Sequence, residues 1–173
     1  MHVIEGTATV DDIDDFVARI GEVGTEHDCV VQAFDARYVV DRAHLEAAVR
    51  QAARAWLRDE AVARDPAVEI LLYAAGRRQI SEALTMGVGE GETPVVAVVV
   101  SDFPDAPFET DDTEMAAAEA LAALLEPAAT LGDAADEARI CEFFEVGGAE
   151  RAATDATLSE LVRERTVLLT VNK

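Results

Sequence analysis

The chain has 173 residues, half of them hydrophobic, and a formal net charge of −21 at pH 7. That length and apolar fraction suffice for a single domain over residues 1–173, with a core that needs no metal or disulfide. The sequence has no run of about 18 apolar residues, so we expect no transmembrane helix and no membrane partner. Its first residues carry neither a basic nor an apolar signal region, which favours a cytoplasmic location.

The charge is unusual in its distribution as well as its size. Lys173 is the sole lysine, and the other thirteen cations are arginines. The acids do not form the block that is typical of a disordered tail, because they are spread through apolar, periodic segments. A basic partner would require one acidic patch, whereas here the excess is general. The pattern favours a protein kept soluble in molar intracellular salt, where like charges are screened, from a halophilic, archaeon-like source.

The N-terminal part alternates strands and helices. Alternating β-branched residues predict a strand at 2–10, followed by an amphipathic helix that Asp11 or Asp12 caps and that two glycines close. A short strand is expected at 29–34. The longest helix is predicted at 41–58, where apolar residues recur every three or four positions and form one buried stripe that extends to Trp56 and Leu57.

The middle of the chain contains two apolar runs. The first, at 68–75, predicts a strand that ends at Gly76 and turns directly into a short helix at 77–84. The residues of that helix expected to face inward are Ile80, Ala83 and Leu84. The second run, at 95–100, is continuously apolar and predicts a central strand buried on both faces. A proline-rich loop follows it.

The C-terminal part is predicted to be mostly helical. An alanine-rich helix is expected at 111–125, helical segments at 133–144 and 157–164, and a last strand at 166–171. Together the elements predict an α/β (α+β) fold. We expect a mixed sheet of about five strands, with helices packed on it and a helical region before the last strand.

Groups that could carry catalysis are isolated in the sequence. His44 is predicted to face outward near a helix start without an evident partner, and Cys29 and Cys141 lie apart as two buried thiols. The glycine-rich stretch 87–91 precedes a strand instead of following one, so it lacks the context of a phosphate-binding loop. No nucleophile elbow or metal-ligand spacing is present. We therefore predict a binding protein with no catalytic residues, no metal and no cofactor.

Arginines are concentrated between Arg37 and Arg78. This window contains eight arginines and six acids, so its net charge is +2 while the rest of the chain carries −23. On the predicted helix 41–58, four arginines lie on one ridge opposite the apolar stripe, at positions 42, 50, 54 and 58. Glu46 is the single acid on that ridge. The ridge is either a solvated face with i, i+4 pairing or an anion-binding surface, and the sequence leaves both open.

Arg77 and Arg78 form the sole pair of adjacent cations in the chain. At a predicted helix start, the helix dipole disfavours each cation by about 0.3–1 kcal/mol. The free N–H groups of the same helix start favour an anion. The pair is therefore explained either by a bound anion or by one arginine reaching a neighbouring carboxylate.

The segment from Glu69 to Leu84 resembles the small tRNA-binding subunit of the KEOPS complex. That family has a strand, then Gly-x-Arg-Gln-Ile, then a short helix, and the positions that match are Gly76, Arg78, Gln79 and Ile80. Two further segments are similar to the family: the strand and long helix with its His44-Leu45 pair, and the closing segment 164–169.

The resemblance implies a non-catalytic subunit of the KEOPS complex, which installs threonylcarbamoyladenosine in tRNA. Such a subunit docks on the atypical kinase/ATPase subunit and binds the single-stranded 3′ CCA end of tRNA. The alternative is a protein–protein regulator of that kinase without tRNA binding of its own.

The resemblance and the arginine pattern together define the expected contact residues. Those expected at the CCA end are Gly76, Arg77, Arg78, Gln79 and Ile80. The ridge expected at the acceptor stem consists of Arg50, Arg54 and Arg58. The partner-binding candidates are two adjacent rings that are hard to bury together on one helix face, Phe143 and Phe144.

Overall fold

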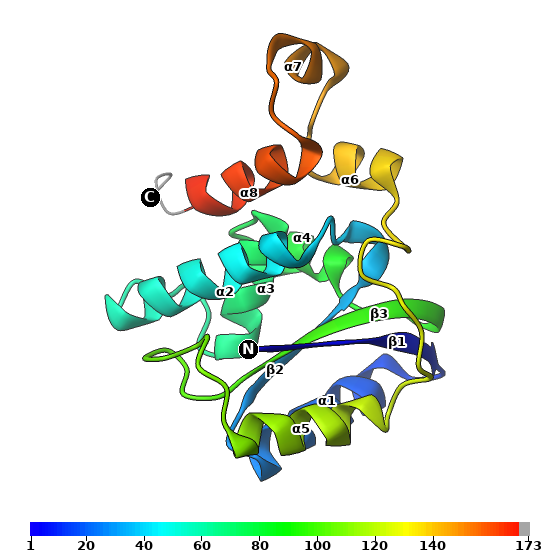
Figure 1. The fold of residues 1–173 in the computed structure, drawn as a ribbon, viewed down its shortest axis with the longest axis vertical. Helices are drawn as coiled ribbons and strands as arrows, with labels where there is room; N and C mark the ends of the chain where they lie inside the picture. The colour runs from blue at the N-terminus through cyan, green and yellow to red at the C-terminus, as the bar shows by residue number, and fades with distance from the viewer. Residues whose placement is uncertain (170–173) are drawn as a thin grey trace.

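A computed structural model describes residues 1–169 of the chain (Figure 1). In chain order, the elements before the last strand are β1 (His2–Val10), α1 (Ile13–Glu26), β2 (Val30–Asp35), η1 (Ala36–Tyr38), α2 (Arg42–Leu57), α3 (Pro66–Ala75), α4 (Ile80–Ala83) and η2 (Leu84–Met86). The last strand and the elements after it are β3 (Gly91–Val100), α5 (Asp112–Ala122), α6 (Glu137–Phe143), α7 (Gly148–Ala153) and α8 (Leu158–Leu168).

The sheet has three strands in the order β1-β3-β2, and both pairings are antiparallel. β3 is the central strand, with Val98 opposite Val3 of β1 and Gln32 of β2. Its side chains alternate between two hydrophobic clusters, and every residue from 95 to 100 is buried. This confirms the prediction of a central strand that is buried on both faces.

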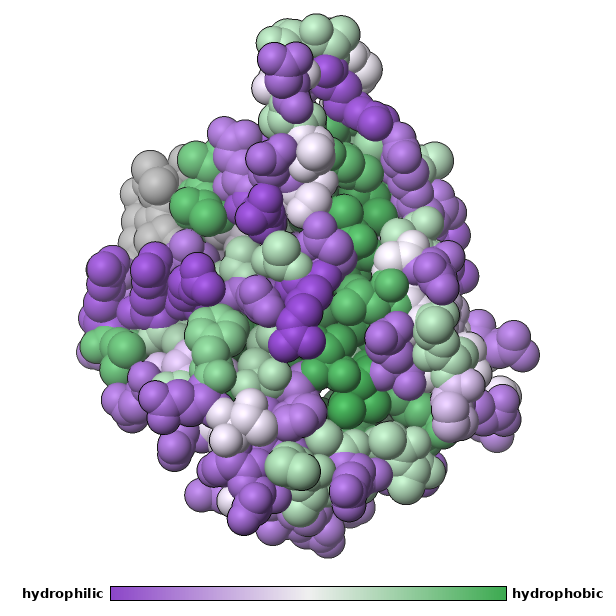
Figure 2. Space-filling model, viewed as in Figure 1, coloured by the Kyte–Doolittle hydropathy of each residue, from purple (hydrophilic) through white to green (hydrophobic). Residues whose placement is uncertain are grey.

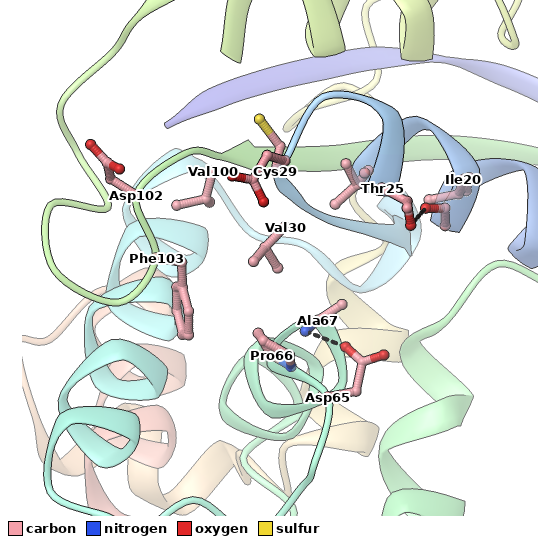
Figure 3. Close-up of a pocket in the computed structure, with 14 residues that line it drawn as sticks. Ile20, Thr25, Cys29, Val30, Asp65, Pro66, Ala67, Val100, Asp102 and Phe103 are labelled. Carbon is pink, nitrogen blue, oxygen red and sulfur yellow. Dashed lines mark hydrogen bonds between the residues drawn. The ribbon is translucent and has the colours of Figure 1, made fainter. Parts of the chain in front are cut away.

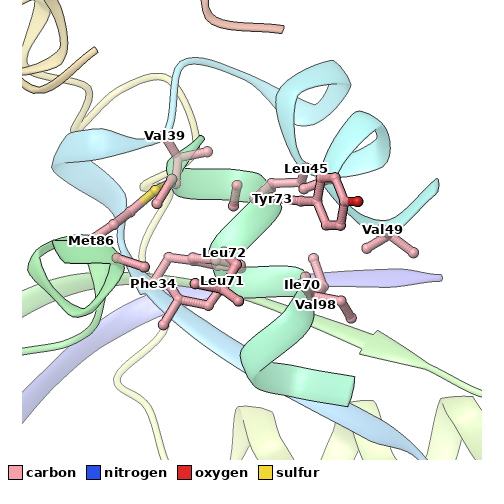
Figure 4. Close-up of a cluster of buried hydrophobic side chains, with 14 of the residues drawn as sticks. Phe34, Val39, Leu45, Val49, Ile70, Leu71, Leu72, Tyr73, Met86 and Val98 are labelled. Atoms are coloured by element: carbon pink, nitrogen blue, oxygen red, sulfur yellow. The ribbon is translucent and has the colours of Figure 1, made fainter. Parts of the chain in front are cut away.

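Helices cover both faces of the sheet, as Figure 1 shows. α1 and α5 lie on one face, where Phe16, Ile20 and Leu121 join the inward side chains of the strands. On the other face α3 packs against β2, and α2 packs against both α3 and α8. The larger cluster lies between these helices and the sheet (Figure 4), with Phe34 of β2 and Leu45 of α2 completely buried.

Residues 68–75, predicted to be a strand, belong instead to the helix α3. Asp65 caps its start, accepting the Ala67 N–H at 2.8 Å, and Pro66 occupies the first turn, where its missing N–H is harmless. Gly76 ends the helix in the left-handed conformation, at φ +59°. The helix is buried on nearly all sides between the sheet and α2, so its sequence lacks the polar face that would have identified it.

The sheet is therefore smaller than predicted, with three strands instead of about five and with antiparallel pairing instead of mixed. Residues 166–168 of the predicted last strand are the end of α8, and 170–171 lie outside the described residues. α8 begins with a capping box between Thr157 and Glu160. It buries Val162 and Thr166 one turn apart, which fixes a helical register through the β-branched residues.

The other predicted elements are confirmed in type, with small shifts at their ends. The N-caps of α1, α2 and α5 are Asp12, Asp41 and Asp111. Gly21 and Gly24 lie inside α1 and do not close it. The predicted helical region 133–144 forms only at Glu137–Phe143, and α7 was not predicted.

A buried carboxylate joins α5 to the end of β3. Glu114 accepts hydrogen bonds from the Ser101 N–H at 3.2 Å and from His2 at 2.7 Å, and the α-amino group of Met1 lies 2.9 Å away. Burial opposes its ionisation, but the hydrogen bonds from Met1, Ser101 and His2 outweigh that effect and lower the pKa of Glu114.

Candidate functional site

The segment from Gly76 to Ile80 is a turn between α3 and α4, which we call the arginine turn. Its first N–H groups close α3, because Gly76 donates to Tyr73 O and Arg77 to Leu72 O, each at 3.1 Å. A Cβ atom on Gly76 would lie 3.3 Å from the Cβ of Arg165 in α8. The turn therefore requires glycine both for its positive φ and for the close approach of α8.

The arginine pair follows the C-terminus of α3 and does not lie at the start of a helix. α4 begins only at Ile80 and has four residues. A cation at the C-terminus of a helix is stabilised by about 0.3–1 kcal/mol. This is the same amount by which a cation at the N-terminus is destabilised. The pair is thus stabilised by α3, and the dipole argument for a bound anion at this position is wrong.

Arg77 is held by the protein itself. Its Nη2 donates to the carbonyl oxygen of Phe143, and its guanidinium lies 5.2 Å from the centre of the Phe143 ring. Its Nε also lies 3.9 Å from a carboxylate oxygen of Glu82. Arg77 is consequently half-buried and joins the arginine turn to α6.

The next three residues of the turn face solvent. Arg78 and Gln79 are exposed, and Arg78 makes one long hydrogen bond, of 3.4 Å, to Leu169 O at the end of α8. Ile80 is 45% exposed and Leu84 is 58% exposed, so the prediction that both face inward is wrong and only Ala83 is buried. α4 is too short to bury a full apolar face. The exposed aliphatic side chains are Ile80 of α4 and Leu84 of η2.

His44 is buried beneath the turn, and the prediction that it faces outward is wrong. Its Nε2–H donates to Ala74 O at 2.8 Å, which satisfies one of the last carbonyl groups of α3. Nδ1 is buried and has no hydrogen-bond partner among residues 1–169. Burial lowers the pKa of His44, although the bond to Ala74 and the charge of Asp41 oppose that shift. The ring is therefore neutral at pH 7 and supports the turn from below.

The arginine ridge of α2 is exposed, as Figure 2 illustrates with hydrophilic side chains along the side that α2 occupies in Figure 1. Arg42 pairs with Glu46 at 2.8 Å, and the Arg50 guanidinium lies 5.2 Å from the centre of the Phe108 ring. Arg54 and Arg58 make no ion pair among residues 1–169. One end of the ridge is thus internally paired, and the other presents free guanidinium groups.

A small crevice lies between the segment that follows α2 and the arginine turn. It is lined by Glu60 and Val62, which follow α2, and by Arg78 and Leu169. The same end of the molecule exposes large apolar side chains: Leu57 (59%), Val62 (53%), Val167 (44%) and Leu168 (38%). α2 and α8 pack against each other, and their C-terminal ends lie on the same side of the molecule (Figure 1), so we call these four residues the apolar end. The exposure of Leu57 corrects its predicted place in the buried stripe.

The two adjacent phenylalanines have different environments. Phe144 is 1% exposed and packs edge-on against His44, with ring centres 5.5 Å apart, so it belongs to the core. Phe143 is half-buried and packs edge-on against Tyr38 at 5.2 Å and against Phe144 at 5.0 Å. Of this pair, only Phe143 presents surface to a partner.

A cavity of about 540 Å³ lies away from the arginine turn. Figure 3 shows it between the end of α1, the start of β2 and the start of α3. Cys29 is in its lining, and burial together with the charges of Asp111, Glu114 and Asp28 raises the pKa of that thiol to about 11. Such a thiol stays protonated at neutral pH and is a poor nucleophile.

Within residues 1–169, no group of three or more His, Cys, Asp or Glu side chains is arranged to hold a metal ion. In the same part of the chain, no helix is long and apolar enough to cross a membrane.

The fold and the site together define a small α+β protein with a cationic turn, an arginine ridge and an adjoining apolar end, which is the arrangement of a binding module. A family model described as kinase binding protein CGI-121 matches residues 9–169. The chain therefore belongs to the CGI-121 family of kinase binding proteins, and this match supports the resemblance of the Gly-x-Arg-Gln-Ile segment. A comparison with curated proteins found no significant match.

Proposed function

We propose that the protein is a non-catalytic, cytoplasmic KEOPS subunit that binds the kinase subunit and the 3′ CCA end of tRNA. The observation that carries the RNA part is the arginine turn, where Arg78, Gln79 and Ile80 of the family motif are exposed together. These three residues offer a forked cation, an amide and an apolar surface side by side. That combination suits an unpaired nucleotide, which presents a phosphate, polar base edges and a base plane.

The turn contributes short-range interactions, which the acidity of the chain requires. At the molar salt that the composition favours, the Debye length is about 3 Å, so counterion release adds little to RNA affinity. Bidentate arginine bonds and base stacking, the latter about 1–3 kcal/mol per base, persist under those conditions. Arginine suits this role better than lysine because its plane both stacks and forks.

The arginines divide into different roles under this proposal. Arg78 contacts the CCA end, and Arg54 and Arg58 lie free to contact the acceptor stem. Arg77 and Gly76 shape the turn, because Arg77 is already bound to Phe143 O. Arg50 is partly committed to Phe108.

Filter binding in high KCl, with intact tRNA and with tRNA trimmed of its CCA end, tests the RNA part. We expect trimming and Arg78→Ala each to weaken binding about tenfold, and Arg54→Ala to weaken both RNAs equally. Arg19→Ala, which removes an exposed arginine from α1 on the opposite face of the sheet, is the matched control and should change nothing. Equal binding of the two RNAs by the unaltered protein would exclude a CCA site and leave the regulator without RNA binding as the better proposal.

For the kinase we propose the apolar end as the docking surface. Phe144, a sequence-based candidate, is buried in the core, whereas the apolar end exposes four large side chains from α2, the segment after it, and α8. Protein interfaces bury exposed apolar side chains of this kind, and the family is described by kinase binding. Apolar contacts also keep their strength in concentrated salt.

Size-exclusion chromatography with the purified KEOPS kinase subunit tests this surface. Val167→Asp should abolish co-elution while leaving tRNA binding intact. Val17→Asp alters a residue that is 58% exposed on α1, against 44% for Val167, and serves as the control that should still co-elute. If Val167→Asp binds the kinase normally, docking occurs elsewhere, and Phe143→Ala is then the informative variant.

A further inference from the structure

The cavity between α1, β2 and α3 (Figure 3) has the dimensions of a small-molecule site. Its volume is about 540 Å³, and sites for small ligands span about 300–1,000 Å³. Four parts of the chain form it: the end of α1, the start of β2, the start of α3 and the segment that follows β3. It shares no lining residue with the arginine turn or the apolar end, so neither function proposed above uses it.

Part of the lining is apolar. Val100 of β3 is 1% exposed, and Val30 of β2, Pro66 of α3 and Phe103 are half-buried around the same space (Figure 3). The Phe103 ring is held by an edge contact with Trp56, with ring centres 5.9 Å apart. A ligand that fills this cavity must therefore offer an aliphatic part to it.

The same lining carries three carboxylates and no basic side chain. Asp28 precedes β2, Asp65 precedes α3 and Asp102 follows β3, and all three are exposed. None of them makes an ion pair among residues 1–169. Figure 3 shows Asp102 and Asp65 on different sides of the cavity, with Val30 between them. The negative charges are thus distributed around the apolar surface and are not gathered at one point.

An organic cation with separated ammonium groups is complementary to this arrangement. Each ammonium group donates hydrogen bonds to a carboxylate, and the methylene groups between them cover the apolar side chains. At the molar salt that the composition favours, the Debye length is about 3 Å, so the charges attract only near contact. Burial of methylene groups is not screened and supplies the rest of the affinity. A bare metal ion would gain nothing from the apolar surface.

We propose that this cavity binds a linear aliphatic diamine or triamine. Its ammonium groups pair with the carboxylates of Asp28, Asp65 and Asp102, and its methylene groups lie against Val30 and Phe103. The binding is non-covalent. It is independent of the RNA and kinase binding proposed above.

The test uses 1,6-diaminohexane, hexylamine and 1,6-hexanediol, which share one chain and carry two, one and no charges. An ion pair at an exposed site contributes up to about fivefold in affinity. Titration calorimetry in high KCl should therefore show about fivefold tighter binding for each added charge. In NMR spectra, the diamine should shift the methyl signals of Ile20 and Val30 in the lining and not those of Val167 at the apolar end.

Asparagine variants remove the charges and keep the backbone. Asp28 and Asp102 have φ of +51° and +46°, a region that asparagine also tolerates, and asparagine is as good an N-cap as Asp65. The variant that combines Asp28→Asn, Asp65→Asn and Asp102→Asn should therefore fold, and it should bind the diamine and the diol within about twofold of each other. Asp59→Asn is the matched control, because Asp59 is exposed and has φ +56° but lies outside the lining. It should keep the full preference.

The other outcomes would overturn the inference. Equal binding of the diamine and the diol by the unaltered protein, or binding of neither, would show that the cavity is not a cation site. Equal binding of hexylamine and the diamine would mean that one ammonium group suffices, as a lysine side chain of another protein could supply, and a diamine would not be the occupant. A preference that survives in the triple variant would place the cation elsewhere.

Discussion

Replacing Gly76 by alanine tests how strongly the arginine turn depends on its backbone. Gly76 has φ +59°, a conformation that costs a residue with a Cβ about 1–2 kcal/mol. The new Cβ would also lie 3.3 Å from the Cβ of Arg165, so α8 must move by a few tenths of an ångström. We expect the free energy of unfolding to fall by about 2 kcal/mol, which for a domain of this size lowers Tm by about 4–8 °C.

Substitutions at two other glycines separate the cost of the positive φ from the cost of the close contact with α8. Gly132 has φ +83° but no atom within 4 Å of its missing Cβ, so Gly132→Ala should show the backbone cost alone, about 1 kcal/mol. Gly89 has neither a positive φ nor a neighbour, and Gly89→Ala should leave the stability unchanged or raise it by up to about 1 kcal/mol. The measurement is urea unfolding followed by circular dichroism in high KCl. If Gly76→Ala is no less stable than Gly132→Ala, the close approach to α8 has no energetic weight and the account of the turn is wrong.

Three further predictions concern titratable groups. Burial lowers the pKa of His44, so below about pH 6.5 the unfolded chain binds a proton before the folded chain does. The free energy of unfolding should therefore fall as the pH is lowered from 6.5 to 5. The His44→Gln variant should lose this pH dependence, and the His27→Gln variant should retain it. The lowered pKa of Glu114 gives stability that is present above about pH 4.5 and is lost as the pH falls through the pKa of the folded state. Glu114→Gln should lower the free energy of unfolding by about 1–3 kcal/mol at pH 7. An unchanged urea midpoint would refute the stabilising role of the Glu114 carboxylate. The pKa of Cys29 is about 11 instead of 9.0, so at pH 8 its alkylation should be about a hundredfold slower than that of a free thiol. The measurement uses the Cys141→Ser variant, so that Cys29 alone reacts. Alkylation at the rate of a free thiol would contradict the burial of the Cys29 thiol.

The sequence predicted most elements but misread α3, and the reason is its position in the fold. A helix with no exposed face has the same continuous apolar sequence as a strand with none, so residues 68–75 fit both. Asp65 and Pro66 carried the deciding information, as an N-cap and a first-turn proline. Counting 166–168 as a strand was a related error, because their β-branched residues lie at the end of a helix whose register Val162 and Thr166 set through the core.

The role of the candidate site residues stays a prediction, to which the structure adds their geometry. Arg78, Gln79 and Ile80 are all exposed, although the sequence predicted that Ile80 faces inward. The same reasoning missed that Arg77 is bound within the protein and that His44 is buried. Both depend on contacts across thirty residues or more, since Arg77 binds Phe143 of α6 and His44 binds Ala74 of α3, and no local pattern encodes them.

The contact between Gly76 and Arg165 has a consequence for the proposed binding of RNA. The arginine turn is completed by a helix almost ninety residues later in the chain, so local opening of α8 removes the shape that the RNA would recognise. Binding that requires the closed form must then suppress the opening of α8. Amide hydrogens along α8 should therefore exchange more slowly in the RNA complex, including those that touch no nucleotide. The C-terminal helix would thus act as a reporter of occupancy at the turn.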